Sequence, residues 1–141
     1  MPFKTMYKSD FYTIEADVVG NLLRSKWHRP VDEQELLTGG TMLYEVLRDT
    51  KVERAVADAQ CIGSLPSSGK EWLSTKFYEL LSQTSLKRLA RVLPSNVFQL
   101  VALESVVTRA DALGVTKFEV RNFADPQQAL DWAIAYKPAL N

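Results

Sequence analysis

Hydrophobic side chains first gather in two short segments near the N-terminus, residues 11–16 and 22–27, which are rich in aromatic and aliphatic residues. Between these segments, Gly20-Asn21 suits a turn that needs a positive φ angle. The pattern predicts two strands joined as a hairpin. The segment ahead of them, residues 3–7, fits either an edge strand or a loose lead-in.

The next apolar residues recur at helical spacing. Asp32 and Glu35 have the spacing of a capping box, which predicts a helix from that point to about Arg48. Gly39-Gly40 inside this helix would cost about 2 kcal/mol relative to two alanines in an exposed helix. We therefore expect a compensating feature, and the simplest is close approach of the helix to the sheet.

Short apolar segments then alternate with helical ones to the C-terminus. Strands are predicted at residues 54–58, 86–93 and 117–123, and helices at about 68–82, from Ser95 or Asn96 to Leu113, and from Pro126 through Ala133. Strands separated by helices of this length are joined by crossovers, so the sheet should be largely parallel. The predicted fold class is α/β, with a single mixed, largely parallel sheet, an N-terminal hairpin and about four helices.

Composition and charge then limit the kinds of partner. The length of 141 residues fits one domain, predicted over residues 1–141 with its core at about 11–135. Seventeen basic side chains balance 17 acidic ones, so no overall field draws the chain to nucleic acid or to an anionic membrane. A single cysteine, Cys61, and the lack of a signal-peptide pattern or a long apolar run predict a cytoplasmic protein with no membrane insertion.

Candidate chemistry is sparse along the chain. His28 is the only histidine, so a serine triad would have to use it, and the sequence has no nucleophile-elbow motif. No His, Cys or carboxylate residues recur at metal-ligand spacing. Lys87, Arg88 and Arg91 form the one basic cluster, which is interpreted as a solvated strand edge, with an anion site as the alternative. We expect no enzymatic activity, no cofactor and no metal.

The segment ADAQCIGSLPSSGK, residues 57–70, lies between a predicted strand and a predicted helix. Its glycines resemble those of a phosphate-binding loop, but five residues separate Gly63 from Gly69 where that motif has four. Glu71 also stands where the motif has the serine or threonine that holds magnesium, and a carboxylate there would repel phosphate. The spacing therefore argues against a nucleotide-binding loop.

The serine pair in this segment has two open interpretations. Ser68 and Glu71 have the spacing of a capping box, in which Ser68 would cap the following helix. Alternatively, Ser67 or Ser68 accepts a phosphoryl group, which would bring about 1.5 to 2 negative charges to the start of that helix.

Several segments of the chain resemble the STAS superfamily, the anti-sigma-factor antagonist or SpoIIAA-like fold, and most closely its small stand-alone bacterial members. The resemblance covers residues 12–132. The segments that carry it are Trp27 after the hairpin, Asp58 at the end of a strand, SSGKEW at the start of a helix, RVLPSNVF at 91–98 and FADPQQALDW at 123–132.

This resemblance implies a non-catalytic regulatory module. In the antagonist family an Asp-Ser-Ser/Thr-Gly block lies between strand and helix, and phosphorylation of one serine switches off binding to a partner kinase. Here Ser67-Ser68 precedes a glycine, but Pro66 replaces the aspartate and Asp58 lies eight residues before it. By analogy, Asp58, Ser67, Ser68 and Trp72 would form a partner-binding surface for a protein such as a kinase or an anti-sigma-type regulator.

Two functions from different classes remain open. A regulatory or protein-interaction module, switched by phosphorylation of the segment 58–72, predicts that Ser67, Ser68 and Trp72 are exposed on one surface. A carrier of a small apolar ligand or a lipid, which related folds hold between helix and sheet, predicts an internal apolar pocket. Exposed sheet edges are also compatible with a homodimer.

Overall fold

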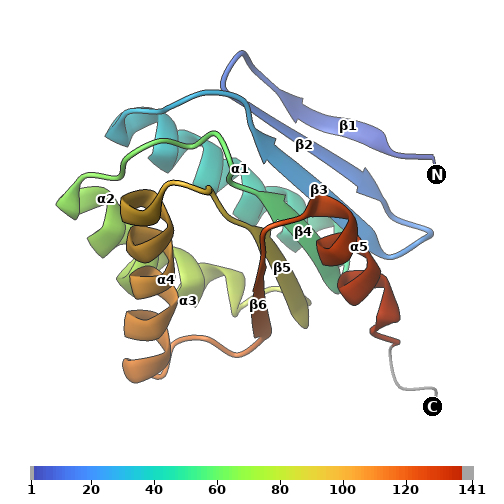
Figure 1. Cartoon of the computed structure of the whole chain (residues 1–141). Helices are drawn as coiled ribbons and strands as arrows, with labels where there is room; N and C mark the ends of the chain where they lie inside the picture. The colour runs from blue at the N-terminus through green and yellow to red at the C-terminus, as the bar shows by residue number, and fades with distance from the viewer. Residues whose placement is uncertain (1, 138–141) are drawn as a thin grey trace.

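The computed structural model describes residues 2–137 and confirms the α/β fold (Figure 1). The predicted domain, residues 1–141, extends past this range at both ends. A single six-stranded sheet has the strand order β1-β2-β3-β4-β5-β6, so each strand lies beside its neighbours in the sequence. The strands are β1 (Lys4–Lys8), β2 (Tyr12–Asp17), β3 (Leu22–Trp27), β4 (Arg54–Asp58), β5 (Arg88–Val92) and β6 (Glu119–Phe123).

Four helical segments join or follow these strands. They are α1 (Glu33–Thr50), the continuous run of α2 (Ser67–Trp72), the π-helical turn η1 (Leu73–Phe77) and α3 (Tyr78–Leu81), then α4 (Val97–Ala112) and α5 (Pro126–Ala135). The hairpin β2–β3 is antiparallel, as predicted, and the undecided N-terminal segment is a third antiparallel strand, β1. Strands β3 to β6 pair in parallel. None of the described helices is both long enough and apolar enough to cross a bilayer.

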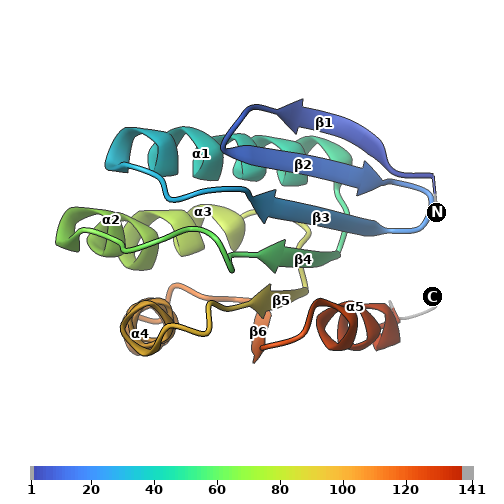
Figure 2. The same ribbon diagram turned by 45° about the horizontal axis from the view of Figure 1, so that its top comes forward.

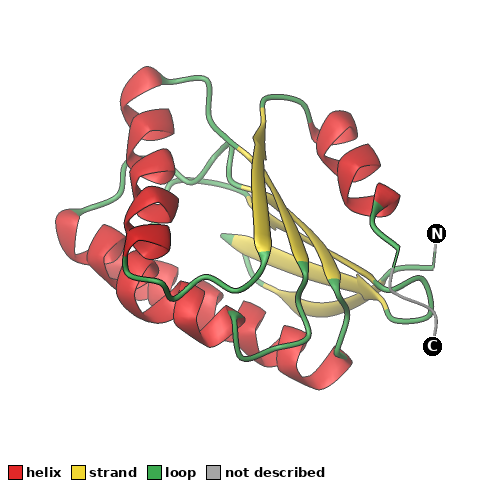
Figure 3. Ribbon diagram, turned by 90° about the horizontal axis from the view of Figure 1, so that it is seen from below, coloured by secondary structure: helices red, strands yellow, loops and turns green. Residues whose placement is uncertain are grey.

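The helices are divided unequally between the two faces of the sheet. α1, the α2–α3 segment and α4 lie on one face, and α5 alone lies on the other (Figures 2 and 3). The main core lies under the larger group of helices, with Ile14, Leu23, Leu36, Leu47 and Leu89 among its buried residues. A second, smaller cluster lies under α5 and consists of Leu22, Val56, Ala90, Val92, Ala129 and Ala133.

The C-terminal end of α5 is held to the sheet by two arginines. Arg54 donates from Nη1 to the carbonyl oxygens of Ile134, at 2.8 Å, and Tyr136, at 3.1 Å. Arg88 donates to the carbonyl oxygen of Trp132 at 2.9 Å, and its guanidinium lies 4.1 Å from the centre of that tryptophan ring. Because the last carbonyls of a helix lack intrahelical partners, these contacts close α5 onto the sheet.

The glycine pair in α1 is explained by close approaches on two sides. A Cβ atom at Gly39 would lie 2.5 Å from the ring of Trp27 in the sheet, which confirms the predicted close approach to the sheet. A Cβ atom at Gly40 would lie 2.7 Å from the ring of Trp72, so this second glycine makes room for the neighbouring helix instead. The capping box of Asp32 and Glu35 is confirmed, with bonds of 2.8 and 3.1 Å.

The predicted basic cluster is divided by the pleat of β5. Arg88 lies on the face that carries α5, whereas Arg91 is buried on the opposite face, beneath α4. Side chains three positions apart in a strand point to opposite faces. The interpretation of all three residues as one solvated edge is therefore wrong for Arg91.

Candidate functional site

The predicted serines lie at the start of α2, on the surface of the molecule. Ser67 and Ser68 are both exposed and belong to the first turn of the helix. Pro66 is the N-cap, so Ser68 lies two positions inside the helix and cannot act as its cap. The predicted capping box of Ser68 and Glu71 is therefore wrong, which leaves both hydroxyls facing solvent.

Glu71 makes a different contact, across to α4. Its carboxylate accepts from Nη2 of Arg109 at 3.0 Å, and the two side chains form an ion pair about half exposed to solvent. This pair lies over a groove of about 370 Å³ between α2 and α4, whose other lining residues include Ser67, Lys70 and Ser105. Ser67 is thus at the edge of a groove that also contains two cationic side chains.

Apolar side chains are exposed in the first turns of α4, one of the two helices that line this groove. Phe98 is 85% exposed, Val97 is 65% exposed and Val101 is 56% exposed, and we call these three residues the α4 patch. Val101 lies one helical turn before Ser105, which lines the groove, so the α4 patch leads toward it along the helix. Large apolar side chains that gather on a surface mark interaction sites more often than scattered ones do.

The α4 patch was not predicted from the sequence. The core-facing side of α4 is apolar as well, with Leu103, Val106 and Ala110 buried. Two valines and a phenylalanine off that side, in the first turns of the helix, were the available signal. An amphipathic helix needs only one apolar side to be packed, so a second apolar side is unexplained by folding alone.

Trp72 does not join the exposed serines. Its half-buried ring stacks on Phe77, with 5.3 Å between ring centres, and packs against Gly40 of α1. The exposed surface predicted for Ser67, Ser68 and Trp72 therefore contains the two serines, while the tryptophan fixes α2 against α1.

Asp58 is also separated from the serines. It is the last residue of β4, and its Oδ1 accepts the backbone N–H of Gln60 at 3.0 Å. Its side chain lines a groove on the α5 face of the sheet, together with Lys26 and His28. The four predicted site residues are therefore distributed over three surroundings and do not form a single cluster.

Groups with shifted pKa values belong to structural contacts. Hydrogen bonds from Arg29 and from the backbone of Asp32 lower the pKa of Glu35, and Arg48 lowers the pKa of Asp49. Burial raises the pKa of the Tyr12 phenol. Across residues 2–137, no three His, Cys, Asp or Glu side chains lie close enough together to hold a metal ion.

On the face that carries α1, the α2–α3 segment and α4, the space between the helices and the sheet is small. The cavity there measures about 60 Å³ and is lined largely by core side chains such as Leu36, Phe77 and Leu103. That volume would hold about two water molecules at roughly 30 Å³ each, whereas small-molecule pockets measure about 300–1,000 Å³. This geometry gives little support to a lipid held between the sheet and the three helical segments on this face.

The comparisons with known proteins add no relative. No family model matches the chain, and neither the curated proteins nor the solved structures include one that is significantly similar to it. The resemblance to the STAS superfamily stays a prediction from the sequence, and the evidence for function is the geometry of the molecule itself.

Proposed function

We propose that this chain is a non-catalytic protein-interaction module whose docking surface consists of the α4 patch and the adjoining groove between α2 and α4. The observation that carries the proposal is Phe98, an aromatic side chain that is 85% exposed in the first turn of α4, the helix whose Ser105 lines that groove. The resemblance to anti-sigma-factor antagonists supports the same class of function, because such proteins act by binding another protein.

The energetics favour a contact centred on Phe98. Aromatic side chains dominate the small set of interface residues whose truncation costs about 2 kcal/mol or more. In the free protein this ring is almost fully in water, so nearly all of its apolar area can be removed from water when a partner binds. The partner is a protein that offers apolar side chains to α4, with polar contacts at the edge of the groove.

Phosphorylation of Ser67 is the proposed switch on this surface. Its exposed hydroxyl lies in the groove that Lys70 and Arg109 also line. A phosphate there would add about 1.5 to 2 negative charges and would compete with Glu71 for the guanidinium of Arg109. Because the ion pair of Glu71 and Arg109 shapes the groove, the modification would change the docking surface.

The experiment places a photo-reactive benzoylphenylalanine at position 101 in the native cell and identifies the proteins that become cross-linked. We expect one partner to be captured reproducibly, and its capture to fall at least tenfold when F98D is added. Leu113 is a matched control because it is an apolar residue, 52% exposed, at the C-cap of the same helix. L113D should leave the capture unchanged.

Equal losses in F98D and L113D, or no loss in either, would refute the docking surface. The switch has its own test, in which S67D and S67A are compared in the same cross-linking assay. S67D should weaken the capture and S67A should preserve it, whereas equal capture by both variants would refute regulation at Ser67.

A further inference from the structure

The sheet face that carries α5 is only partly covered. α5 packs over β4 and β5, and the antiparallel strands β1 to β3 extend beyond it (Figure 3). Between α5 and these strands lies a groove of about 540 Å³, within the usual range for small-molecule sites. It lies on the opposite side of the sheet from the α4 patch, so it is separate from the proposed docking surface.

Two rows of facing residues cross the strands in this groove. The outer row runs Lys8, Thr13, Lys26 and Asp58, each the register partner of the next. The inner row runs Thr5, Glu15, Arg24 and Val56 in the same way. Residues in one such row lie on the same face of the sheet and close enough to act on one ligand.

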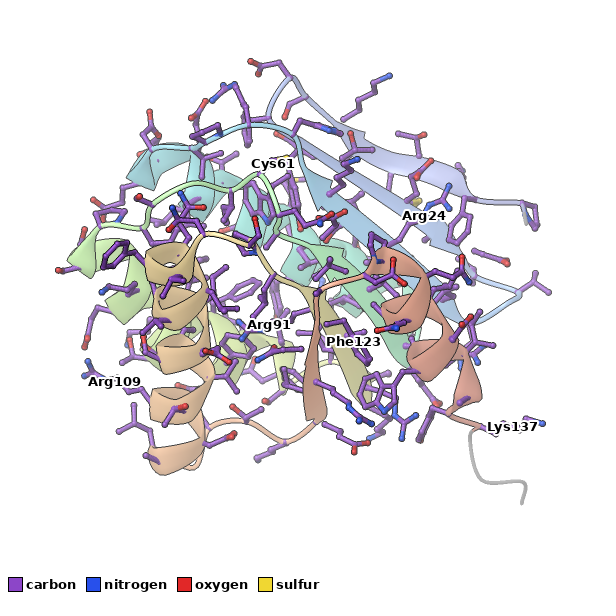
Figure 4. All side chains as sticks on the ribbon, viewed as in Figure 1. Arg24, Cys61, Arg91, Arg109, Phe123 and Lys137 are labelled. Carbon is purple, nitrogen blue, oxygen red and sulfur yellow. The ribbon has the colours of Figure 1, made fainter. Side chains whose placement is uncertain are left out.

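The inner row is electrically balanced. Arg24 donates from Nε to Glu15 at 2.8 Å, and its guanidinium lies 3.8 Å from the centre of the Phe3 ring. Figure 4 labels Arg24 on the strands beside α5. The charge of Arg24 is thus paired with Glu15, and the flat face of its guanidinium is covered by the Phe3 ring. The two charged side chains therefore form a neutral wall of the groove.

The outer row carries one net positive charge. Its two ammonium groups, of Lys8 and Lys26, flank Thr13, and within residues 2–137 neither lies at ion-pair distance from a carboxylate. Thr13 Oγ1 and His28 Nε2 share a hydrogen bond of 2.7 Å between them. Two lysines and the single Asp58 leave a net charge of +1, which matches a monoanion.

An apolar surface adjoins these charges. Val56 and Val92 come from the sheet, and Pro126 and Leu130 come from α5. The lining includes no Phe, Tyr or Trp among the residues that the structure describes, so an aliphatic body fits this surface better than a stacked aromatic ring.

We propose that this groove binds a small aliphatic carboxylate. The carboxylate accepts hydrogen bonds from Lys8, Lys26 and the Thr13–His28 pair, and the aliphatic part lies on the apolar surface next to α5. The negative charge of Asp58 beside Lys26 disfavours a dianion such as phosphate, because like charges at this distance repel.

The test uses octanoate as the probe, with the full chain at low ionic strength and binding followed by calorimetry. We expect octanoate to bind at least fivefold more tightly than octanol, which lacks the charge, and than acetate, which lacks the aliphatic body. Inorganic phosphate should not compete. Equal binding of octanoate and octanol, competition by phosphate, or no binding of octanoate would overturn the proposal.

Two matched pairs of variants locate the site. K26Q should weaken octanoate binding about threefold to fivefold, and K76Q, which removes the same charge from η1 on the other side of the sheet, should not. Q127W should block the groove and abolish binding, whereas Q128W adds the same ring at the next exposed position of α5, outside the groove. If the two members of either pair behave alike, octanoate binds elsewhere and the proposal is wrong.

The proposals for the docking surface and for this groove can be refuted independently. F98D, which tests the α4 patch, should leave octanoate binding unchanged, and loss of octanoate binding in Q127W leaves the cross-linking experiment unaffected.

Discussion

Arg91 brings a guanidinium into the interior of the molecule, between α4 and the sheet (Figure 4). The residue is 5% exposed, and it donates to Asn122 Oδ1 at 3.0 Å, to the carbonyl oxygen of Leu103 at 2.9 Å and to the Tyr78 hydroxyl at 3.3 Å. A buried charge is tolerated when such bonds replace its hydration. Arg91 therefore ties β5 to β6, α3 and α4 at once.

Replacing this side chain should destabilise the fold. We expect R91A to lower the free energy of unfolding by about 3 kcal/mol, because hydrogen bonds to charged groups are worth about 1.5–3 kcal/mol each and the buried acceptors lose their donor. Urea unfolding followed by circular dichroism measures this. R121A, at an exposed position of β6, serves as the control and should change the value by less than about 0.5 kcal/mol. Equal effects of the two variants would contradict the role assigned to Arg91.

Glu35 gives the fold a pH dependence on the acid side. Arg29 donates to its carboxylate at 2.6 Å, and this contact is the main reason that the pKa of Glu35 is lowered in the folded state. A depressed folded pKa contributes stability above the unfolded value, about 4.3, and loses it as the pH falls through the folded value.

E35Q should therefore be less stable than the original chain near pH 6, and the difference should shrink as the pH falls below about 4. Thermal unfolding between pH 3 and pH 7 measures it. E33Q, on the same first turn of α1, controls for the loss of an acidic side chain near the helix N-terminus. A difference that persists unchanged to pH 3 would contradict this origin.

At the scale of elements, the packing of α1 depends on its two glycines. An alanine at either position would gain about 1 kcal/mol of helix propensity. Each added methyl would also meet a tryptophan ring at less than 3 Å, and overpacking of this kind costs about 1–3 kcal/mol. Trp27 is buried in the sheet with its ring centre 3.8 Å from that of Tyr12, whereas Trp72 is only half-buried and lies 5.3 Å from Phe77, so Trp27 has less freedom to move.

We therefore expect G39A to lower the melting temperature more than G40A does. T41A, exposed on the same helix, should leave the melting temperature unchanged or raise it. If G39A and G40A instead stabilise the protein as T41A does, the close approach of α1 to its neighbours is not the reason for the glycines.

Element order could be predicted because periodicity and caps agree along most of the chain. The strand at residues 54–58 and the start of the last helix at Pro126 match their predictions. The π-helical turn η1 was not predictable from periodicity. It coincides with Ser74 and Thr75, whose hydroxyls donate to the carbonyls of Lys70 and Glu71, at 2.6 and 2.7 Å, and compete with the helical pattern.

The candidate site was less predictable than the elements, for a physical reason. The serine pair was identified from local sequence, but the partner of Glu71 is Arg109, which lies 38 residues away on α4. The groove between α2 and α4, and the rows across β1 to β3, likewise depend on contacts between distant segments. An acidic residue three positions after a serine fits a capping box, but the same residue can pair with a distant arginine, and a single sequence does not show which contact it makes.

At the scale of the whole molecule, the sheet separates two surfaces with different properties. One face is covered by three helical segments and the other by α5 alone (Figure 2). The first face presents the α4 patch, and the second has the open groove beside α5. Both edge strands expose charged side chains, with Lys4 and Lys8 on β1 and Glu119 and Arg121 on β6. Such charges discourage pairing between sheet edges, and the homodimer remains an untested prediction.

Strand order in this molecule repeats chain order, and that has a consequence for synthesis on the ribosome. Each strand can pair with one already made as it emerges, so most of the sheet can assemble from the N-terminus onward. Of the described elements α5 is the last to be made, and it packs against Leu22, Val56 and Val92 and accepts the hydrogen bonds of Arg54 and Arg88. A nascent chain that stalls before this helix therefore holds an assembled sheet whose apolar cluster on this face is exposed to solvent. Chaperones bind exposed apolar surface of this kind.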